Sequence, residues 1–343
     1  METNMKILVT GSAGFVGGYV VEELLHQGHA VVGIDNFSKY GELTKNYDTN
    51  PKYTFIQGDV KDVGLLKELI VDCDQIIAIA AMIGGISYFH TYAYDLLAEN
   101  ERIIASTFDA AIWAHRTKKL KKVNVVSSSM VFENTTIFPT PEGEQLKCPP
   151  PSSTYGFQKL ATEYYAQGAY EQYQLPFTII RPFNCVGIGE RQARGGQTII
   201  SGNIKLALSH VVPDLIQKVL KGQNPLHLLG SGHQIRHYTY GGDLARAIGL
   251  CLENPQALNE DFNISTNQST TVLELAQLIW EKIRPQDSFQ YVIDPAYPYD
   301  VQKRVPDISK AKRLLGFEAT TSLDQMLDEV IPWIDQQVQL GNI

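Results

Sequence analysis

The chain has 343 residues, of which 44% are hydrophobic and 19% charged, a composition typical of a folded globular protein and not of a disordered one. Its length predicts about two domains and a core that needs no disulfide or structural metal. Acidic residues outnumber basic ones by 37 to 29, which excludes a general nucleic-acid binder, and the one basic run, at Lys118, Lys119, Lys121 and Lys122, is expected to be a solvated helix end.

Short apolar runs alternate with amphipathic stretches from Lys6 onwards, which predicts βαβ units and a parallel sheet covered on both faces. The expected strands are residues 6–10, 30–35, 53–58, 75–80, 123–127 and 177–182. The expected helices between them are residues 14–27, 62–72, 96–114 and 155–173. The predicted fold is therefore α/β, with a Rossmann-type doubly wound parallel sheet in residues 1–184.

The pattern changes after Asn184, where glycines and prolines become more frequent and the segments shorter. Residues 185–343 are predicted to form mainly a smaller, mixed C-terminal substrate domain, with a return to the sheet domain at about residues 238–255. Its expected helices are residues 211–221 and 271–283, and its expected strands are residues 225–229 and 289–293.

A glycine-rich turn follows the first expected strand. Gly11, Gly14 and Gly17 have a spacing that permits a tight turn and close approach of the backbone to a pyrophosphate at a helix N-terminus, although glycines also mark ordinary turns. The next expected strand ends in Asp35, an acid placed to bind ribose hydroxyls and to repel a 2′-phosphate; an acid that begins a turn is the alternative. Asp59 is placed to accept from an adenine amino group or, equally, to start a helix. The pattern predicts NAD rather than NADP.

Tyr155 and Lys159 stand four residues apart at the start of an expected helix, so both side chains lie on one face. Tyrosine, with an ordinary pKa near 10, is a poor base at neutral pH, but a neighbouring ammonium and an oxidised nicotinamide both favour the phenolate. Such a pair alone is common on helix surfaces. Serines at positions 127–129 follow the fifth expected strand, at the edge where α/β sheets place their sites, and a hydroxyl there is placed to bind the same substrate oxygen.

These motifs occur in the order of a known family, which the chain resembles from Lys6 to about Trp333. It is similar to the extended short-chain dehydrogenase/reductases, specifically the NAD-dependent nucleotide-sugar epimerase and dehydratase family. The resemblance rests on the glycines, the two acids, the serine motif, Tyr-x-x-x-Lys, Arg181-Pro-Phe-Asn184 and Arg304-Val-Pro-Asp307. It implies NAD as cofactor, a nucleoside-diphosphate sugar as substrate, and neither a nucleic acid nor a membrane as partner.

The resemblance also implies a role for individual residues. Ser128 matches the catalytic Ser or Thr, Tyr155 the acid–base group and Lys159 its partner. The residues expected to bind or order the cofactor site are Gly11, Gly14, Phe15, Val16, Gly17, Asp35, Asn36, Asp59, Val60, Ala80, Asn100, Tyr155 and Lys159. The residues expected to bind the substrate are Gly84, Ser129, Asn184, His210, Arg236, Arg304 and Asp307. A bidentate guanidinium suits a diphosphate, although an ion pair of Arg236 with Asp243 and a helix cap by Asp307 are alternatives.

Three positions bear on the reaction. Family 4,6-dehydratases carry Asp-Glu directly after the catalytic Thr, whereas Ser129 and Met130 stand here, which disfavours a dehydratase. The glycines at positions 84–85 resemble a loop of GDP-fucose synthases and GDP-mannose 3,5-epimerases, and the stretch around His210 resembles the one that bears the acid histidine of the fucose synthases. Those enzymes supply a cysteine where this chain has Met130, which cannot transfer a proton. His210 stays a candidate acid, with a helix cap or surface residue as the alternative.

The leading hypothesis is an NAD-dependent nucleoside-diphosphate-sugar epimerase that acts at C4 through a transient 4-keto sugar. The alternatives within the family are a nucleotide-sugar 4-dehydrogenase, a 4-keto reductase and a 3,5-epimerase that uses His210. A further alternative is a non-enzymatic, NAD-binding scaffold on a degenerate epimerase fold, which the intact Ser128, Tyr155 and Lys159 disfavour.

Location and assembly can also be addressed from the sequence. The four cysteines lie far apart without metal-ligand spacing, which predicts free thiols. We expect no signal peptide and no membrane span, which would need a run of about 20 apolar residues. The predicted location is therefore the cytoplasm. The expected helices 96–114 and 155–173 carry apolar and aromatic residues on more than one face. This predicts a homodimer contact, as the resemblance also implies, with buried core helices of a monomer as the alternative.

Overall fold

The computed structural model describes residues 4–42, 44–84, 91–190, 199–201, 204–206, 210–296 and 300–342. A sheet of seven parallel strands forms its centre, in the order β13-β6-β5-β4-β1-β2-β3. The strands are β1 (Lys6–Thr10), β2 (Ala30–Asp35), β3 (Tyr53–Gln57), β4 (Gln75–Ala78), β5 (Lys122–Val126), β6 (Phe177–Pro182) and β13 (Glu260–Ile264). The strand order reverses beside β1, and such a reversal leaves a crevice at the carboxyl ends of the strands.

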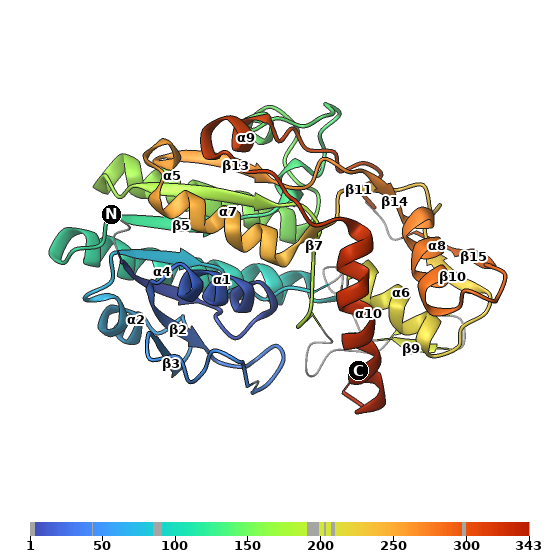
Figure 1. Cartoon of the computed structure of the whole chain (residues 1–343). Helices are drawn as coiled ribbons and strands as arrows, with labels where there is room; N and C mark the ends of the chain where they lie inside the picture. Colours follow the sequence, from blue (N-terminus) through green and yellow to red (C-terminus); the bar gives the residue numbers. More distant parts are fainter. Residues whose placement is uncertain are drawn as a thin grey trace.

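Helices cover both faces of the sheet (Figure 1) because alternate strand residues point to opposite faces. In β1, Ile7 and Val9 pack into one hydrophobic core and Leu8 into the other. The helices of the first core are α1 (Phe15–His26), α7 (Gly241–Glu253) and α9 (Ser309–Leu315). The helices of the second core are α2 (Val63–Ile70), α4 (Ala93–Thr117) and α5 (Thr154–Tyr173). The predicted doubly wound α/β fold is confirmed.

A smaller lobe lies beside the sheet (Figure 1) and has its own core, in which Trp280 is fully buried. Its helices are α6 (Val211–Leu220), α8 (Val272–Ile283) and α10 (Leu323–Gln339). Short strand pairs accompany them: β10 (Leu226–Leu229) with β15 (Tyr291–Asp294), β11 (Ile235–Arg236) with β14 (Thr270–Thr271), β12 (Thr239–Tyr240) with β7 (Cys185–Val186), and β8 (Ile199–Ser201) with β9 (Ile204–Leu206). Single 3-10 turns are η1 (Ser129–Phe132), η2 (Glu144–Leu146) and η3 (Pro255–Ala257).

The chain returns to the sheet after it has begun the smaller lobe. Helix α7 packs against α1, and β13 pairs with β6 as the seventh strand (Figure 1). The sequence analysis did not predict β13, because its first two residues, Glu260 and Asp261, are acidic. In the fold these acids pair with Lys310, and Asp261 also pairs with the buried Arg181. The division at residue 184 stays a prediction.

The basic run is only partly the solvated helix end that we expected. Lys118 is the C-cap residue of α4, and Lys118, Lys119 and Lys121 are exposed. Lys122 is instead the first residue of β5 and only 2% exposed, with its Nζ donating to the carbonyl oxygen of Cys251 at 2.5 Å. Because β5 begins at Lys122, the side chain of this one lysine points into the interior.

In the part of the chain that the structure describes, none of the helices is long and apolar enough to cross a bilayer. No three of its His, Cys, Asp and Glu residues gather in a group that could hold a metal. All four cysteines are free thiols.

Candidate active site

A cavity of about 1090 Å³ lies between the sheet and the smaller lobe. Residues that follow the carboxyl ends of β1, β2, β4, β5 and β6 line one side, as is typical of parallel α/β sheets. Residues from α6 and from the segment around Arg236 line the other side. The cavity brings together every site residue expected from the sequence except Gly84, Asn100 and Asp307.

The turn after β1 has a geometry that requires glycine. Gly11 has a φ of +71°, and a Cβ on it would lie 2.9 Å from the Cα of Ala80. A Cβ on Gly17 would lie 2.0 Å from the carbonyl oxygen of Gly11. Gly14 is the N-cap of α1, so the first turn of the helix lines the cavity with N–H groups that no helical carbonyl accepts. This cradle fits the pyrophosphate of a dinucleotide.

Asp35 lies at the end of β2, one strand away from the glycine turn. Its carboxylate accepts the N–H of Phe37 at 2.8 Å and that of Ala13 at 3.2 Å. Burial raises the pKa of Asp35, and these two N–H groups oppose the increase. Asn36 donates to Asp59 at 3.4 Å, and both line the same end of the cavity as Asp35. A carboxylate at this place accepts ribose hydroxyls and repels a phosphate, so these residues fit NAD.

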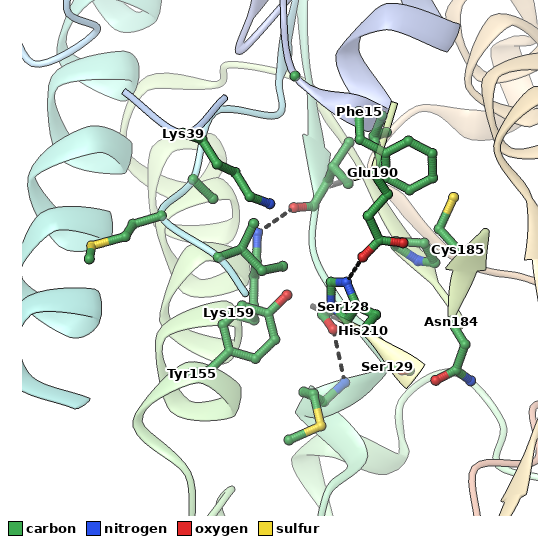
Figure 2. Close-up of a pocket in the computed structure, with 18 of the residues that line it drawn as sticks. Phe15, Lys39, Ser128, Ser129, Tyr155, Lys159, Asn184, Cys185, Glu190 and His210 are labelled. Carbon is green, nitrogen blue, oxygen red and sulfur yellow. Dashed lines mark hydrogen bonds and ion pairs between the residues drawn. The ribbon is translucent and has the colours of Figure 1, made fainter. Parts of the chain in front are cut away.

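The side chains of Ser128, Tyr155 and Lys159 project into the cavity close to one another (Figure 2). Ser128 is the N-cap residue of η1; its hydroxyl accepts the N–H of Met130 at 3.2 Å and hydrogen-bonds to the phenol of Tyr155. Burial raises the pKa of Tyr155 to about 12, whereas the Ser128 hydroxyl and the charge of Arg304 lower it. The grouping predicted from the serine motif and the Tyr-x-x-x-Lys spacing is thus present in the fold.

Lys159 lies one helical turn beyond Tyr155 on α5. Its Nζ donates to the carbonyl oxygen of Val126 at 3.0 Å. Burial lowers the pKa of this ammonium to about 8, and the carboxylate of Glu163 opposes the decrease. The charged form of Lys159 is therefore less favourable than that of an exposed lysine.

Two arginines face the cavity from the smaller lobe. Arg236 pairs with Asp300 at 3.4 Å, not with Asp243. Arg304 is half-buried, and its guanidinium contacts the sulfur of Met130, beside the serine motif. Burial and, second, the nearby charge of Arg236 together lower the pKa of Arg304 to about 10. Two cations brought this close favour an anionic ligand between them.

Asp243 is engaged elsewhere, so the alternative of an Arg236–Asp243 ion pair is wrong. Its Oδ1 accepts from Arg246 at 2.7 Å and its Oδ2 from the N–H of Thr321 at 3.0 Å. It therefore anchors the start of α7 to the segment before α10.

His210 is the N-cap residue of α6, but its ring does not cap the helix. It hydrogen-bonds to the carboxylate of Glu190, and both residues line the cavity on the side of Asn184 (Figure 2). Asn184 has a φ of +37° and donates to the carbonyl oxygen of His237 at 3.3 Å. Ser129 lines the same cavity next to Ser128.

The three remaining expected residues do not line this cavity. The amide of Asn100, on α4, accepts the N–H of Met82 at 2.6 Å and donates to its carbonyl oxygen at 2.9 Å, which orders the segment after β4. Asp307 accepts the N–H of Ser309, the first residue of α9, at 2.8 Å, but the N-cap residue of this helix is Ile308. Gly84 is buried at the end of a described segment, and position 85 lies outside the described residues.

Several residues of the cavity were not predicted from the sequence. Tyr238 stands two residues after Arg236, and this spacing places both side chains on one side of an extended segment. The spacing could therefore have identified Tyr238 as a residue of the same site. No spacing in the sequence indicated Glu190, Lys39 or Asp300, which reach the cavity only through the tertiary fold.

A dinucleotide cradle and a Ser-Tyr-Lys group at the edge of a doubly wound sheet define an NAD-dependent enzyme of the short-chain dehydrogenase/reductase class. More specifically, the chain belongs to the NAD dependent epimerase/dehydratase family, which it matches over residues 7–265.

The known relatives extend over nearly the whole chain. An "uncharacterized UDP-glucose epimerase YtcB" of Bacillus subtilis (strain 168) is 28% identical, over 98% of this chain and 99% of the relative. The structure of a UDP-glucose 4-epimerase with UDP-glucose from Thermotoga maritima is 29% identical, with a TM-score of 0.80 over 97% of this chain and 100% of that one. The structure of a UDP-glucuronic acid 4-epimerase from Bacillus cereus with UDP-glucuronic acid and NAD is 26% identical, with a TM-score of 0.80 over 97% and 99%.

Proposed function

We propose that the protein is an NAD-dependent nucleoside-diphosphate-sugar epimerase that inverts the configuration at C4 of the sugar. The observation that carries the proposal is the meeting, in one cavity, of the glycine cradle, the Ser128–Tyr155–Lys159 group and two arginines. The two solved relatives described above are 4-epimerases with UDP-sugars, which supports both the position of the reaction and UDP as the nucleotide.

The side chains of the chain itself carry the proton chemistry. When bound, NAD supplies the acceptor and then the donor of the C4 hydride, and its cationic nicotinamide favours the phenolate of Tyr155. Tyr155 removes the proton from the O4 hydroxyl and returns it after the flat 4-keto sugar has turned its other face. Ser128, already hydrogen-bonded to the phenol, holds the same oxygen. The ammonium of Lys159, one helical turn along α5, is the cation that favours the phenolate of Tyr155 in this mechanism.

The substrate side supports a reaction that is confined to C4. Arg236 and Arg304 are placed to hold a diphosphate while the sugar turns. Met130, beside Arg304, presents a thioether where a 3,5-epimerase needs a proton-transferring group.

A 3,5-epimerase is the second candidate, because His210 lines the cavity and its ring is held by the buried carboxylate of Glu190. In that reaction His210 would exchange a proton with a sugar carbon next to the keto group. The two candidates differ in whether solvent hydrogen enters a carbon of the product.

The test is to incubate the purified protein with UDP-sugars in deuterated water and to record NMR spectra. A C4 epimer without carbon-bound deuterium is expected. Deuterium at C3 or C5 would identify the second candidate, and net formation of NADH would identify a dehydrogenase.

Tyr155→Phe should lower turnover by at least about 100-fold. Tyr173→Phe, at the C-terminal end of the same helix, is the matched control. Full activity of Tyr155→Phe would exclude the proposed mechanism.

We also infer that two copies of the chain pair through α4 and α5. Tyr94 on α4 and Phe157 and Tyr164 on α5 are 76%, 49% and 56% exposed, which is unusual for aromatic side chains unless a partner covers them. Light scattering should give the mass of a dimer, and a monomer would contradict this inference.

The free thiols support a location in the cytoplasm.

A further inference from the structure

Three buried side chains and the partly buried Asp261 form a connected ladder behind the catalytic residues. Arg181 on β6 is fully buried, and its Nε and Nη2 donate to the two carboxylate oxygens of Glu163 on α5 at 2.7 and 2.8 Å. The other side of the guanidinium forms an ion pair of 2.7 Å with Asp261 on β13. The hydroxyl of Ser127 donates to Glu163 at 2.6 Å. The ladder therefore links α5 to the last three strands at one edge of the sheet.

Glu163 adjoins the catalytic group by two routes. Tyr155, Lys159 and Glu163 are spaced four residues apart on α5, so they lie on the same face of the helix, and all three are buried. Glu163 also holds Ser127, whose neighbour in the chain is Ser128. Its carboxylate can thus influence both the Lys159 ammonium and the backbone that carries the catalytic hydroxyl.

Stability alone does not account for an ion pair at this place. Burial of an arginine and a carboxylate carries a desolvation cost that their attraction often only balances, and apolar residues of similar volume are commonly as stable. The carboxylate of Glu163, which is 1% exposed, does provide a negative charge near Lys159, an ammonium that burial pushes towards the neutral form.

The surroundings of Lys159 leave Glu163 as the carboxylate that acts on it. On α5 itself, the titratable groups that face it are Tyr155 and Glu163. Arg181 on β6 lies behind Glu163. The uncharged groups that face Lys159 from neighbouring elements are the Val126 carbonyl of β5 and Asn100 of α4, which lines a small cavity with it.

We propose that Glu163 is a positioning residue for catalysis: it keeps Lys159 protonated next to Tyr155 and, through Ser127, fixes the segment that carries Ser128. Arg181 and Asp261 hold its carboxylate in place. The inference rests on the proposed function, in which Tyr155 is the acid–base group and Lys159 its cationic partner.

The test compares Glu163→Gln with Asp261→Asn. Both substitutions remove one negative charge from the same guanidinium with little change in volume, but only Glu163 adjoins Lys159. In Glu163→Gln, we expect kcat to fall at least about tenfold with KM within about twofold, and the alkaline limb of the kcat profile to move about one pH unit lower. The limb should stay in place in Asp261→Asn and in Glu163→Asp, which keeps the charge.

A purely structural role gives a different result. If Glu163→Gln and Asp261→Asn lower the melting temperature and kcat alike while both pH profiles stay unchanged, the proposal is overturned. If Glu163→Gln does not fold, the double variant Glu163→Met/Arg181→Met, which leaves no unpaired guanidinium, carries the same expected shift, and an unchanged profile in it overturns the proposal equally.

A direct titration separates this proposal from the proposed function. In protein labelled with 13C-lysine, with the Lys159 signal assigned from Lys159→Arg, the pKa of Lys159 should fall in Glu163→Gln and not in Asp261→Asn. This measurement requires no sugar substrate. A wild-type protein that does not epimerise any sugar would refute the proposed function, whereas an unchanged Lys159 pKa in Glu163→Gln would refute the role of Glu163.

Discussion

The variant Lys122→Met should change how the stability of the protein depends on pH. Lys122 lies beneath the C-terminal end of α7, where its Nζ donates to the carbonyl oxygen of Cys251. Gln75 donates to the next carbonyl oxygen, that of Leu252, at 2.9 Å. Both carbonyls belong to the last turn of α7 and have no N–H partner within the helix, so these two side chains satisfy a buried helix end.

The magnitude follows from the burial of this ammonium. Burial lowers the pKa of Lys122 to about 8, whereas a lysine in an unfolded chain has a pKa of about 10.4. Between these values the unfolded chain holds a proton that the folded chain lacks, so the contribution of Lys122 to stability rises with pH. From pH 7 to pH 9.5 this contribution increases by about 2 kcal/mol.

Urea unfolding of the wild type and Lys122→Met between pH 7 and pH 9.5 measures this contribution, because the thiols and phenols that also titrate there are common to both proteins. The difference in unfolding free energy should grow by about 2 kcal/mol in favour of the wild type. Lys121→Met, at the exposed neighbouring position, should leave the pH dependence unchanged. A difference that stays constant or shrinks as pH rises would refute the reasoning.

Two further substitutions test the cofactor cradle and its link to the sugar side. Gly17→Ala should release NAD from a folded protein, measured by chromatography of the bound cofactor, because its Cβ would clash with the carbonyl oxygen of Gly11. Gly18→Ala, whose Cβ would lie 3.2 Å from the flexible end of Lys45 and 3.5 Å from the hydroxyl of Tyr47, should retain NAD. Tyr19→Phe removes the acceptor of the Ile188 N–H, a bond of 2.9 Å. It should raise KM for the sugar nucleotide several-fold with kcat and bound NAD unchanged, and loss of NAD would contradict it.

The elements that the sequence predicted are those whose signal is local. The first six strands of the sheet are apolar runs bounded by turns, and the structure places each within two residues of the expected bounds. Strand β13 has no such signal, since Glu260 and Asp261 are stabilised by Lys310 and Arg181, partners at least about 50 residues away along the chain. Lys122 is a similar case, because its buried partner is a carbonyl of α7.

The same distinction applies to the candidate site. Tyr155 and Lys159 were identifiable because a helix brings residues four apart onto one face. Glu163 continues that spacing, but its significance depends on Arg181, which belongs to a different strand. The partner of Arg236 could not be chosen from sequence either, because Asp243 and Asp300 are equally acidic and only the fold decides between them.

The return of the chain to the sheet bears directly on how such an enzyme works. A sugar that turns between two hydride transfers must move while the cofactor and the acid–base group stay fixed. Tyr19 on α1 accepts from Ile188 and hydrogen-bonds to Tyr240, which in turn hydrogen-bonds to Glu329 on α10. This chain of bonds ties the cofactor helix to the smaller lobe, while β13, through Asp261, braces the ladder behind Lys159. Both braces depend on segments after residue 184, so the second half of the chain contributes to the rigidity of the catalytic group as well as to the sugar side of the cavity.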